Sequence, residues 1–447
     1  LRGDKMLKLL KGINVPHRKS TYLSVPTEIA SPKSVTIICS MHIGKPATPT
    51  VKVGDAVKVG QLIAEQNGFI SSPVHASISG TVKKIEDALT SQGTYVPAIT
   101  IESDGLMTAD ESIVPPAVNS REDFISAVKN SGIVGLGGAG FPTYVKLDPK
   151  QNVDTLIING AECEPYITSD SYTMISKAAL ISQFFELMKK YIGIKKIIIG
   201  IEKNKPDAIE VMEKLAESDP AVTVKTLPSS YPQGAEKVLI YNTTGRTVPA
   251  GKLPADVGCI VCNCTTAASV SEYINTGMPL VRKCITVDGS AVKNPQNVIV
   301  PIGISLSDVF DFCGGFSETP EKIIYGGPMM GLSVPSDDVP VIKNTNAILA
   351  FGKADSKAPK TTACIHCGRC VNHCPLGLAP TEIEKAYKSK NGEVLEKLCV
   401  NLCMECGCCS YICPAKRPLV QTNKLAKAVL RDYISKKQAK AKEENGK

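Results

Sequence analysis

The chain has 447 residues, 43% of them hydrophobic and 21% charged, and this length allows about three domains that each bury a core. The apolar content excludes a disordered chain, no apolar run reaches the roughly 18 residues of a membrane-spanning helix, and the start lacks a secretory signal, so we expect a soluble intracellular protein. Of the net charge of +8, residues 415–447 carry +7 (ten Lys or Arg, three Asp or Glu), which disfavours a nucleic-acid binder because its basic residues would spread over the fold.

The first predicted unit is an all-β domain, which we place at residues 1–115. Within it, residues 46–83 alternate Val and Ile with polar residues in two similar halves punctuated by glycines, a pattern of short strands and tight turns. The pattern resembles the barrel sandwich of lipoyl and biotinyl carriers. The carrier's modified lysine would lie between the halves, where this chain has Ser-Pro-Val-His at 72–75. We therefore predict a structural role for this domain, without a swinging arm.

Residues 116–280 alternate predicted strands with predicted helices. The strand-like runs are 154–160, 195–201, 221–227 and 258–262, and the helix-period segments are 171–192 and 206–218. This rhythm predicts a Rossmann-like α/β core with a largely parallel sheet covered by helices. Ligands of such sheets bind at the carboxyl ends of the strands.

A glycine-rich loop lies near the start of this α/β domain. Glycines stand at positions 135, 137, 138 and 140, and Lys146 follows. Glycines without side chains let the backbone approach a ligand closely, and the lysine supplies a positive charge. Both features suit a phosphate-bearing cofactor. The loop lacks the Gly-Lys-Ser/Thr ending of a P-loop, and no strand feeds it at the spacing of a dinucleotide fingerprint. A purely structural turn is the alternative.

Polar residues follow several of the predicted strands. Asn159, Glu162 and Glu164 follow the first, the segment 231–236 opens the next helix, and 263–266 follows the last strand. We expect them to converge at one end of the sheet, where an amide and carboxylates can bind a flavin edge or sugar hydroxyls. Solvated loop carboxylates are the alternative.

A small β-rich module follows the α/β domain, at 281–350. Residues 284–316 indicate strands, a turn at Pro295 and a helix that ends at Gly314. A linker at 351–360 separates the module from a cysteine-rich segment.

Cysteine is the most informative residue type in the chain. Eight of the seventeen cysteines form two runs, each Cys-x2-Cys-x2-Cys-x3-Cys-Pro, the spacing of bacterial two-cluster ferredoxins. In that arrangement three thiolates wrap one iron–sulfur cube, and the fourth binds the other cube. The predicted ligands are Cys364, Cys367, Cys370 and Cys413 for the first cluster, and Cys403, Cys406, Cys409 and Cys374 for the second. We therefore predict a helical, ferredoxin-like domain with two [4Fe–4S] clusters at 351–420.

Other readings of the cysteines fit less well. Zinc sites use pairs of Cys-x2-Cys, and disulfides are disfavoured in the cytosol. Cys399 and Cys408 break the run spacing and are interpreted as bystanders. The strand-like segment with Cys259, Cys262 and Cys264 is interpreted as core, and His366 and His373 stay outside the ligand sets.

The last segment, 421–447, is a basic tail. Leu425, Val429 and Tyr433 recur every four residues with Lys between them, which predicts a solvated last helix. Docking on an acidic partner or an anionic lipid surface is the alternative.

Two of these motifs together resemble a known family. The sequence GxGGAGFPTxxK followed by NGxExEP resembles the flavin- and NADH-binding subunit of respiratory complex I. The full order, with a lipoyl-like sandwich, a soluble-ligand-binding β-grasp (SLBB) module and two ferredoxin runs, resembles the C subunit of Rnf complexes. These complexes are membrane-bound ferredoxin:NAD oxidoreductases coupled to ion transport. The alternatives are the cobalamin reductase of diol-utilisation microcompartments, which has a similar architecture, and a non-catalytic electron-wire scaffold.

The resemblance implies the cofactors and their residues. FMN would be cradled by Gly135, Gly137 and Gly138, with Lys146 on its phosphate. The other positions that match the flavin lining are Asn159, Glu162, Gly234, Glu236, Asn263 and Thr266. Phe141 and Glu164 match positions that contact NAD(H), and Phe141 would do so by stacking. At Ala161 and Ala235 the complex I relative has an aspartate and a glutamate, so those hydrogen bonds are not carried over.

The resemblance also implies the reaction and its setting. NADH would pass a hydride directly to FMN, so no acid–base residue is implied, and the two clusters would conduct single electrons. The partners would be other subunits of an Rnf-type complex, especially a ferredoxin-like iron–sulfur subunit, and not a nucleic acid. The expected location is the cytoplasmic face of the cell membrane, as a peripheral protein whose membrane contact is made through its partners.

Overall fold

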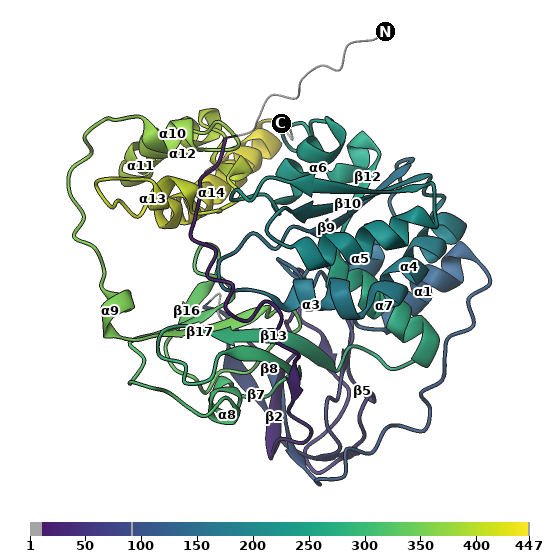
Figure 1. The fold of residues 1–447 in the computed structure, drawn as a ribbon. Helices are drawn as coiled ribbons and strands as arrows, with labels where there is room; N and C mark the ends of the chain where they lie inside the picture. Colours follow the sequence, from purple (N-terminus) through teal and green to yellow (C-terminus); the bar gives the residue numbers. More distant parts are fainter. Residues whose placement is uncertain (1–10, 91–92, 446–447) are drawn as a thin grey trace. The chain divides into compact units, whose positions relative to one another are not determined.

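The structure is a computed structural model that describes residues 11–90 and 93–445, and these form two compact units (Figure 1). The larger unit comprises 17–227 and 254–356, and the smaller unit comprises 11–16, 228–253 and 357–445.

This division differs from the expected α/β domain at 116–280, because 228–253 packs with the cysteine-rich segment. Within the smaller unit, the backbones of Ile13 and Tyr231 exchange two hydrogen bonds, of 2.9 and 2.8 Å. The buried Cys408 thiol also donates to the Tyr231 carbonyl, at 3.8 Å. These contacts link segments that are far apart in the sequence, so local patterns did not indicate them.

The N-terminal domain of the larger unit consists of two antiparallel sheets, as the alternation of Val and Ile predicted. One sheet has the order β2-β8-β7-β4 and the other β3-β5-β6. The strands are β2 Ser34–Ile38, β3 Thr48–Pro49, β4 Ala56–Val57, β5 Leu62–Glu65, β6 Val74–His75, β7 Gly80–Leu89 and β8 Tyr95–Ser103. Ile37, Ile63 and Ile99 are fully buried in the core. β7 requires glycine at position 80, because a Cβ there would lie 1.9 Å from the Glu102 carbonyl oxygen.

The segment between the two halves of the sandwich is buried in the larger unit. Lys343 donates hydrogen bonds of 2.7 Å to the carbonyls of Pro73 and Gly132. Burial lowers the pKa of Lys343 to about 7. At the position where a carrier protein would have its modified lysine, the backbone of this chain is buried and bonded to Lys343.

The α/β core contains the predicted parallel sheet, with the order β11-β10-β9-β12 (Figure 1). Its strands are β9 Thr155–Gly160, β10 Lys196–Glu202, β11 Val222–Leu227 and β12 Cys259–Asn263. Its helices are α1 Arg121–Asn130, α2 Thr143–Leu147, α3 Ser169–Ser176, α4 Ala178–Leu187, α5 Pro206–Glu217 and α7 Cys264–Thr276, with a π-helical turn at Met188–Ile192 and a 3₁₀ turn at Pro254–Val257. The single helix predicted at 171–192 is interrupted at Lys177, whose φ of −117° is not helical.

Local capping explains where two of these helices begin. The Asn263 side chain accepts hydrogen bonds from the amides of Thr265 and Thr266 at the start of α7. Ser120 and Asp123 form a capping box at the start of α1. The end of β12 therefore leads directly into a helix N-terminus at the carboxyl edge of the sheet.

The third part of the larger unit is a mixed six-stranded sheet with the order β1-β14-β13-β17-β15-β16. The elements are β1 Thr27–Glu28, β13 Arg282–Asp288, β14 Gln296–Pro301, α8 Leu306–Phe312, β15 Lys322–Tyr325, β16 Leu332–Val334, β17 Ala347–Phe351 and α9 Lys353–Ser356. The predicted strands, the turn at Pro295 and the helix are present. The linker expected from 351 is shorter, because β17 pairs with β15 through Phe351 and α9 follows.

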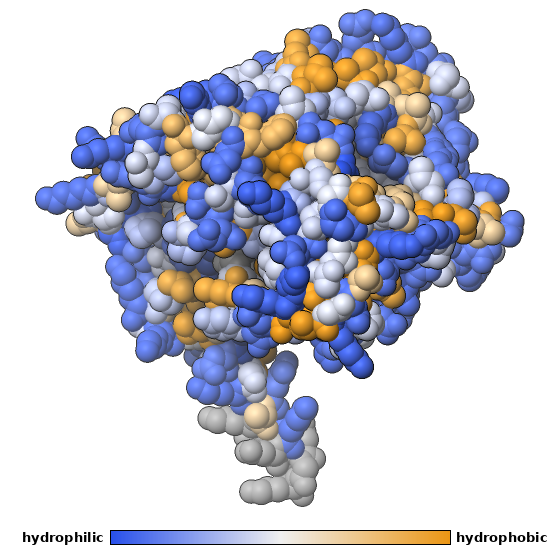
Figure 2. Space-filling view, turned by 90° about the horizontal axis from the view of Figure 1, so that it is seen from below, coloured by the Kyte–Doolittle hydropathy of each residue, from blue (hydrophilic) through white to orange (hydrophobic). Residues whose placement is uncertain are grey.

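The smaller unit is helical. Its helices are α6 Glu236–Thr244, α10 Arg369–Asn372, α11 Pro380–Lys388, α12 Gly392–Lys397, α13 Cys408–Tyr411 and α14 Leu419–Asn445, with a 3₁₀ turn at Val400–Leu402. Leu378, Ile383, Leu395 and Leu430 form the core between α11, α12 and α14. In the described part of the chain, no helix combines the length and apolar character needed to cross a membrane. On the face drawn in Figure 2, hydrophobic residues lie in groups separated by hydrophilic ones.

The expected boundary between the cluster domain and a tail at 421–447 is wrong. The helix α14 begins at Leu419, and its first half is part of the core of the smaller unit. Ala426 and Leu430 are buried, whereas Leu425 is 54% exposed. The buried face is thus offset by one residue from the apolar series that the sequence suggested.

Candidate functional site

The glycine-rich loop lies between the α1 region and α2, and its apex is exposed. Gly135 donates to the Phe141 carbonyl at 2.8 Å, which closes the base of the loop. At the apex, the amides of Gly137, Gly138 and Ala139 donate no hydrogen bond to another described residue. A Cβ at Gly138 would meet nothing within 4 Å. Consecutive open amides of this kind fit an anionic group such as a phosphate.

Three side chains hold this loop in place. The Leu136 amide donates to the Thr266 hydroxyl at 3.0 Å, and the Leu136 carbonyl accepts from the Lys283 ammonium at 2.9 Å. Asn344 donates to the Gly138 carbonyl at 2.9 Å. Lys283 is buried on β13, and burial lowers its pKa to about 7. Lys283 and Asn344 were missed by the sequence reasoning because they come from the β-rich module, far along the chain.

The structure brings three of the predicted motifs together, and Asp170, a residue that the sequence reasoning missed, bonds to two of them. Its amide donates to the Glu162 carboxylate at 2.7 Å, and its carboxylate accepts from Asn263 at 2.7 Å. A Cβ at Gly137 would lie 2.5 Å from Nδ2 of Asn263. The glycine loop, the loop after β9 and the residues after β12 therefore meet at the carboxyl edge of the sheet. Asp170 could have been suspected only from its place just downstream of the NGAECEP motif.

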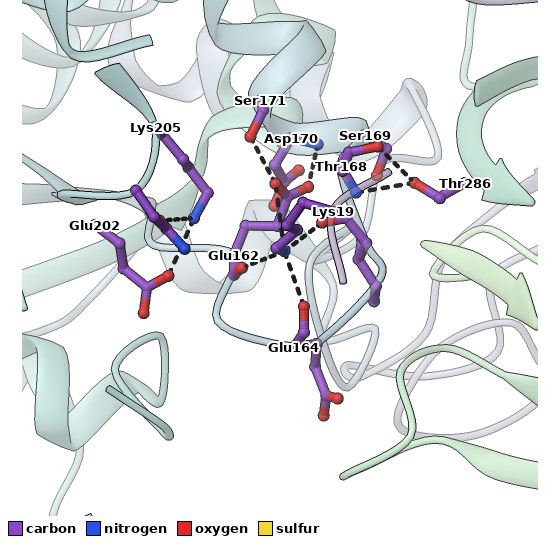
Figure 3. Close-up of polar contacts among 12 residues, drawn as sticks. Lys19, Glu162, Glu164, Thr168, Ser169, Asp170, Ser171, Glu202, Lys205 and Thr286 are labelled. Atoms are coloured by element: carbon purple, nitrogen blue, oxygen red, sulfur yellow. Dashed lines mark hydrogen bonds and ion pairs between the residues drawn. The ribbon is translucent and has the colours of Figure 1, made fainter. Parts of the chain in front are cut away.

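The two glutamates of the NGAECEP motif make different contacts (Figure 3). The buried Glu162 carboxylate accepts from the Asp170 amide and, at 2.7 Å, from the Ser171 hydroxyl, so it caps α3. The Glu164 carboxylate accepts from the amides of Met329 and Met330, at 3.0 and 2.8 Å. These contacts tie the loop after β9 to the connection between β15 and β16.

Two lysines bond to the backbone of the loop after β9, and both were missed (Figure 3). Lys19 donates to the carbonyls of Glu162 and Glu164 at 2.9 and 2.8 Å. Lys205, which is buried between β10 and α5, donates to the Ala161 carbonyl at 2.7 Å and pairs with Glu202 at 3.0 Å. No local sequence pattern marks either lysine as part of this site.

The remaining predicted flavin residues lie in several places. Lys146 on α2 donates to the Val261 carbonyl of β12 at 3.1 Å, and Asn159 lies at the end of β9. Phe141 is half-buried at the base of the glycine loop. Gly234 and Glu236 belong to the smaller unit, next to the start of α6.

The eight cysteines of the two runs line two separate cavities in the smaller unit. The first cavity has an empty volume of about 510 Å³ and is lined by Cys364, Cys367, Cys370 and Cys413, with Arg369 and Thr381. The second has an empty volume of about 340 Å³ and is lined by Cys374, Cys403, Cys406 and Cys409, with Leu378 and Asn423. Each cavity thus receives three cysteines of one run and the last cysteine of the other, and Cys408 also lines the second cavity.

Both cavities combine buried cysteines with N–H···S hydrogen bonds. Of the four run cysteines at each cavity, two are buried, and only the first cavity has an exposed one, Cys367. In the first cavity, the His366 amide donates to the Cys364 sulfur at 3.4 Å. In the second cavity, the Asn423 side chain donates to the Cys403 sulfur at 3.5 Å, and the Leu378 amide donates to the Cys374 sulfur at 3.4 Å. Such N–H···S bonds adjust the electron affinity of iron–sulfur clusters. Asn423 was missed because it lies on α14, in the segment interpreted as a tail.

The cysteines outside the ligand sets are mostly buried. All seventeen cysteines lie in the described residues, and none forms a disulfide. Cys259, Cys262 and Cys264 are core residues, as predicted, and burial raises the pKa of Cys262 to about 12. In the part of the chain that the structure describes, no group of three or more His, Cys, Asp or Glu residues is arranged to hold a single metal ion.

Three family models match parts of the chain. Residues 7–106 match the RnfC barrel sandwich hybrid domain, residues 128–272 the Nuo51 FMN-binding domain, and residues 284–333 the SLBB domain. The sandwich, the α/β core and the β-rich module of the structure correspond to these three matches in order.

The chain is similar to several curated proteins over most of its length. It is 46% identical, over 85% of this chain and 87% of the other, to the C subunit of the Na(+)-translocating ferredoxin:NAD(+) oxidoreductase complex of Acetobacterium woodii. It is 43% identical to the proton-translocating counterpart of Clostridium ljungdahlii, over 84% of each chain. It is 40% identical to the C subunit of the ion-translocating oxidoreductase complex of Rhodobacter capsulatus, over 91% of this chain and 80% of the other. A solved structure of an NAD+-reducing [NiFe]-hydrogenase aligns with a TM-score of 0.49 and 20% identity, over 71% of this chain and 61% of that chain.

Proposed function

The chain belongs to the family of C subunits of ion-translocating ferredoxin:NAD(+) oxidoreductase complexes, and from this premise we propose that it exchanges electrons between NAD(H) and the other subunits of such a complex. In this proposal the chain binds FMN at the glycine loop and holds two [4Fe–4S] clusters. The observation that carries the proposal is that each of two cavities is lined by the first three cysteines of one run and the last cysteine of the other, with Cys408 as a fifth cysteine at the second cavity.

The residues present fit an FMN. The open amides at Gly137, Gly138 and Ala139 would bind its phosphate, and Lys146 is proposed to add a positive charge there. The residues of the larger unit proposed to line the flavin are Gly135, Asn159, Glu162, Asn263 and Thr266, whereas Gly234 and Glu236 of the smaller unit stay predictions from the resemblance. Phe141 and Glu164 are proposed to contact NAD(H), Phe141 by stacking.

The cavities fit iron–sulfur clusters, because thiolates are the usual ligands and each cavity offers the four that a cluster needs. We propose that Cys364, Cys367, Cys370 and Cys413 hold one cluster and that Cys374, Cys403, Cys406 and Cys409 hold the other. When bound, FMN converts between a hydride from NADH and single electrons, and the clusters carry single electrons.

The chain's own residues position the cofactors and shield them. Thr266, Lys283 and Asn344 fix the glycine loop, so its amides are oriented before a ligand arrives. Glu164 ties the loop after β9 to the β15–β16 connection. Cys406 and Cys409 are buried, so they would hold part of the second cluster away from the surface. No side chain has to donate or accept a proton for a direct hydride transfer.

The setting of this activity is also a proposal. We propose that the chain is a peripheral subunit on the cytoplasmic face of the membrane and that it contacts the membrane through partner subunits, one of them an iron–sulfur protein. The relatives at 40–46% identity are named as subunits of such complexes, which favours this function over a cobalamin reductase. The open glycine loop favours it over a scaffold without nucleotide binding.

Cofactor analysis of the whole chain, purified anaerobically, tests the proposed function. We expect about eight iron atoms per chain, as for two [4Fe–4S] clusters, and one FMN. Addition of NADH should then give electron paramagnetic resonance (EPR) signals from both clusters. Zinc in place of iron, or iron without any affinity for flavin, would contradict the proposal.

Asn423 is expected to raise the reduction potential of the second cluster. Its N–H···S bond to Cys403 stabilises the more negative, reduced state, so Asn423→Leu should lower that potential by about 20–60 mV, the equivalent of one net hydrogen bond. EPR-monitored potentiometric titration measures this shift, and the first cluster in the same molecule is an internal reference. Gln421→Leu, on the exposed face of the same helix, should leave both potentials unchanged. An unchanged potential in Asn423→Leu, or equal shifts of both clusters, would refute this role.

A further inference from the structure

We propose that Lys19 is a positioning residue for the flavin and nicotinamide site, because it holds the backbone of the loop after β9 in its binding conformation. Lys19 lies before the first strand of the sandwich, within the region that matches the barrel sandwich model and outside the match to the FMN-binding domain. The inference rests on the proposed function and adds to it a residue from another domain.

The contacts of Lys19 are concentrated on one loop (Figure 3). Its ammonium donates to the carbonyls of Glu162, Glu164 and Ile167, which are three of the seven carbonyls between positions 161 and 167. Its nitrogen also lies 4.0 Å from the Glu162 carboxylate. The side chain is 12% exposed, so these bonds form largely away from water, where charge-assisted hydrogen bonds are strong.

The loop needs such support because its backbone is strained. Glu162 and Tyr166 have positive φ values of 43° and 70°, a region that residues other than glycine rarely adopt. Conformations of this kind persist only where the surroundings fix them, and they are frequent at ligand sites. The ammonium of Lys205 holds the Ala161 carbonyl at the start of the same loop. The loop is thus fixed from two sides by lysine side chains.

The segment that carries Lys19 is itself anchored. The Thr21 hydroxyl lies 2.6 Å from the Thr168 hydroxyl, and the Asn297 side chain donates to the Thr21 carbonyl at 3.2 Å. Both contacts are buried. Lys19 therefore reaches the loop from a fixed backbone, which lets one ammonium position both Glu162 and Glu164.

These contacts predict a specific effect of removing the ammonium. Lys19→Met keeps the apolar part of the side chain and removes the donor, so the loop loses three hydrogen bonds. These bonds no longer stabilise the strained backbone at Glu162 and Tyr166. We expect the dissociation constants of FMN and NAD+ to rise at least about tenfold, the change that follows loss of a charge-assisted donor. The clusters lie in the smaller unit, so their EPR spectra should not change.

The experiment uses the whole chain, purified anaerobically with its iron, and follows FMN and NAD+ binding by flavin fluorescence and calorimetry. Lys33→Met, which removes an exposed lysine of the same domain, is the matched control and should bind both ligands as the wild type does. Lys19→Ala should regain affinity when ethylammonium is added, because the small cation restores the donor. Affinities within about twofold of the wild type in Lys19→Met would overturn the proposal.

The pH dependence of the wild type gives a test that needs no Lys19 variant. Burial lowers the pKa of Lys19 to about 8, so its charge is lost over the pH range just above that value. NAD+ affinity should therefore fall between about pH 7.5 and about pH 9.5. The groups that face Lys19 are Glu162, Cys163, Lys205, Glu202 and His17. Since a thiol titrates in the same range, Cys163→Ser is measured in parallel and should keep the fall.

Unfolding does not explain such a fall. A lysine whose pKa is lower in the folded state than in the unfolded state makes the fold more stable as pH rises between the two values. Lys19→Arg stays charged throughout this range and should lose less NAD+ affinity across it than the wild type, while any fall that comes from Lys283 should be the same in both proteins. An affinity that does not change with pH in the wild type would contradict the proposal. Wild-type protein that binds neither FMN nor NAD+ at any pH would instead refute the proposed function.

Discussion

Replacing Cys374 by alanine is expected to destroy the cluster of the second run, although Cys374 belongs to the first run in the sequence. In the structure Cys374 lines a cavity with Cys403, Cys406 and Cys409. Loss of one of four thiolates should remove about four of about eight iron atoms per chain. Iron analysis measures the loss, and EPR after reduction identifies which cluster remains.

The identity of the lost cluster is established by comparing variants. The spectrum of Cys374→Ala should match that of Cys406→Ala, and the spectrum of Cys413→Ala should match that of Cys367→Ala. Cys399→Ala, which removes an exposed cysteine near the second run, should keep all the iron. If Cys374→Ala instead matched Cys367→Ala, each run would bind its own cluster, and the exchanged fourth ligands would be refuted.

Gly138→Ala is expected to abolish flavin binding while leaving the fold unchanged. A Cβ at this position meets nothing within 4 Å in the protein, so the free energy of unfolding should change by less than about 0.5 kcal/mol. The same methyl group would project from the exposed apex, where the open amides are proposed to bind a phosphate. We expect the dissociation constant of FMN to rise at least about a hundredfold, because backbone approach to the phosphate is blocked. Flavin content after anaerobic purification and thermal unfolding measure the two quantities.

Gly137→Ala provides the contrast. A Cβ there would lie 2.5 Å from the Asn263 side chain, which caps α7 and bonds Asp170. This variant should lose stability as well as flavin, because the methyl group displaces a contact of the protein itself. If Gly138→Ala kept its full flavin content, the flavin phosphate would have to bind somewhere other than this loop.

The parts of the fold that depend on local patterns were predictable from the sequence. The strands at 154–160 and 195–201 lie within one residue of β9 and β10, because apolar runs of strand length bounded by loops have few other solutions. The order of sandwich, α/β core and β-rich module was also predictable. The helix expected at 171–192 is interrupted at Lys177, and the sequence there contains no Gly or Pro to mark the break.

The parts that depend on contacts between distant segments were not predictable. Lys19 and Glu162 are 143 positions apart, and Lys283 and Leu136 are 147 apart. A lone lysine near the N-terminus has the same local pattern whether it is solvated or bonded to buried carbonyls. The tail was misjudged for a related reason, because Ala426 and Leu430 are buried only once α11 and α12 are in place. Tertiary contacts of this kind decide which of several apolar faces is covered.

The most direct test of this account is anaerobic titration of the purified chain with NADH, with the flavin absorbance and the EPR of the clusters recorded together. We predict that NADH bleaches the flavin and that two distinguishable [4Fe–4S] signals then develop. In Asn423→Leu, the second cluster should have a lower reduction potential than in the wild type. A flavin that bleaches while neither cluster can be reduced through it, or a chain with both clusters whose flavin does not respond to NADH, would contradict the account.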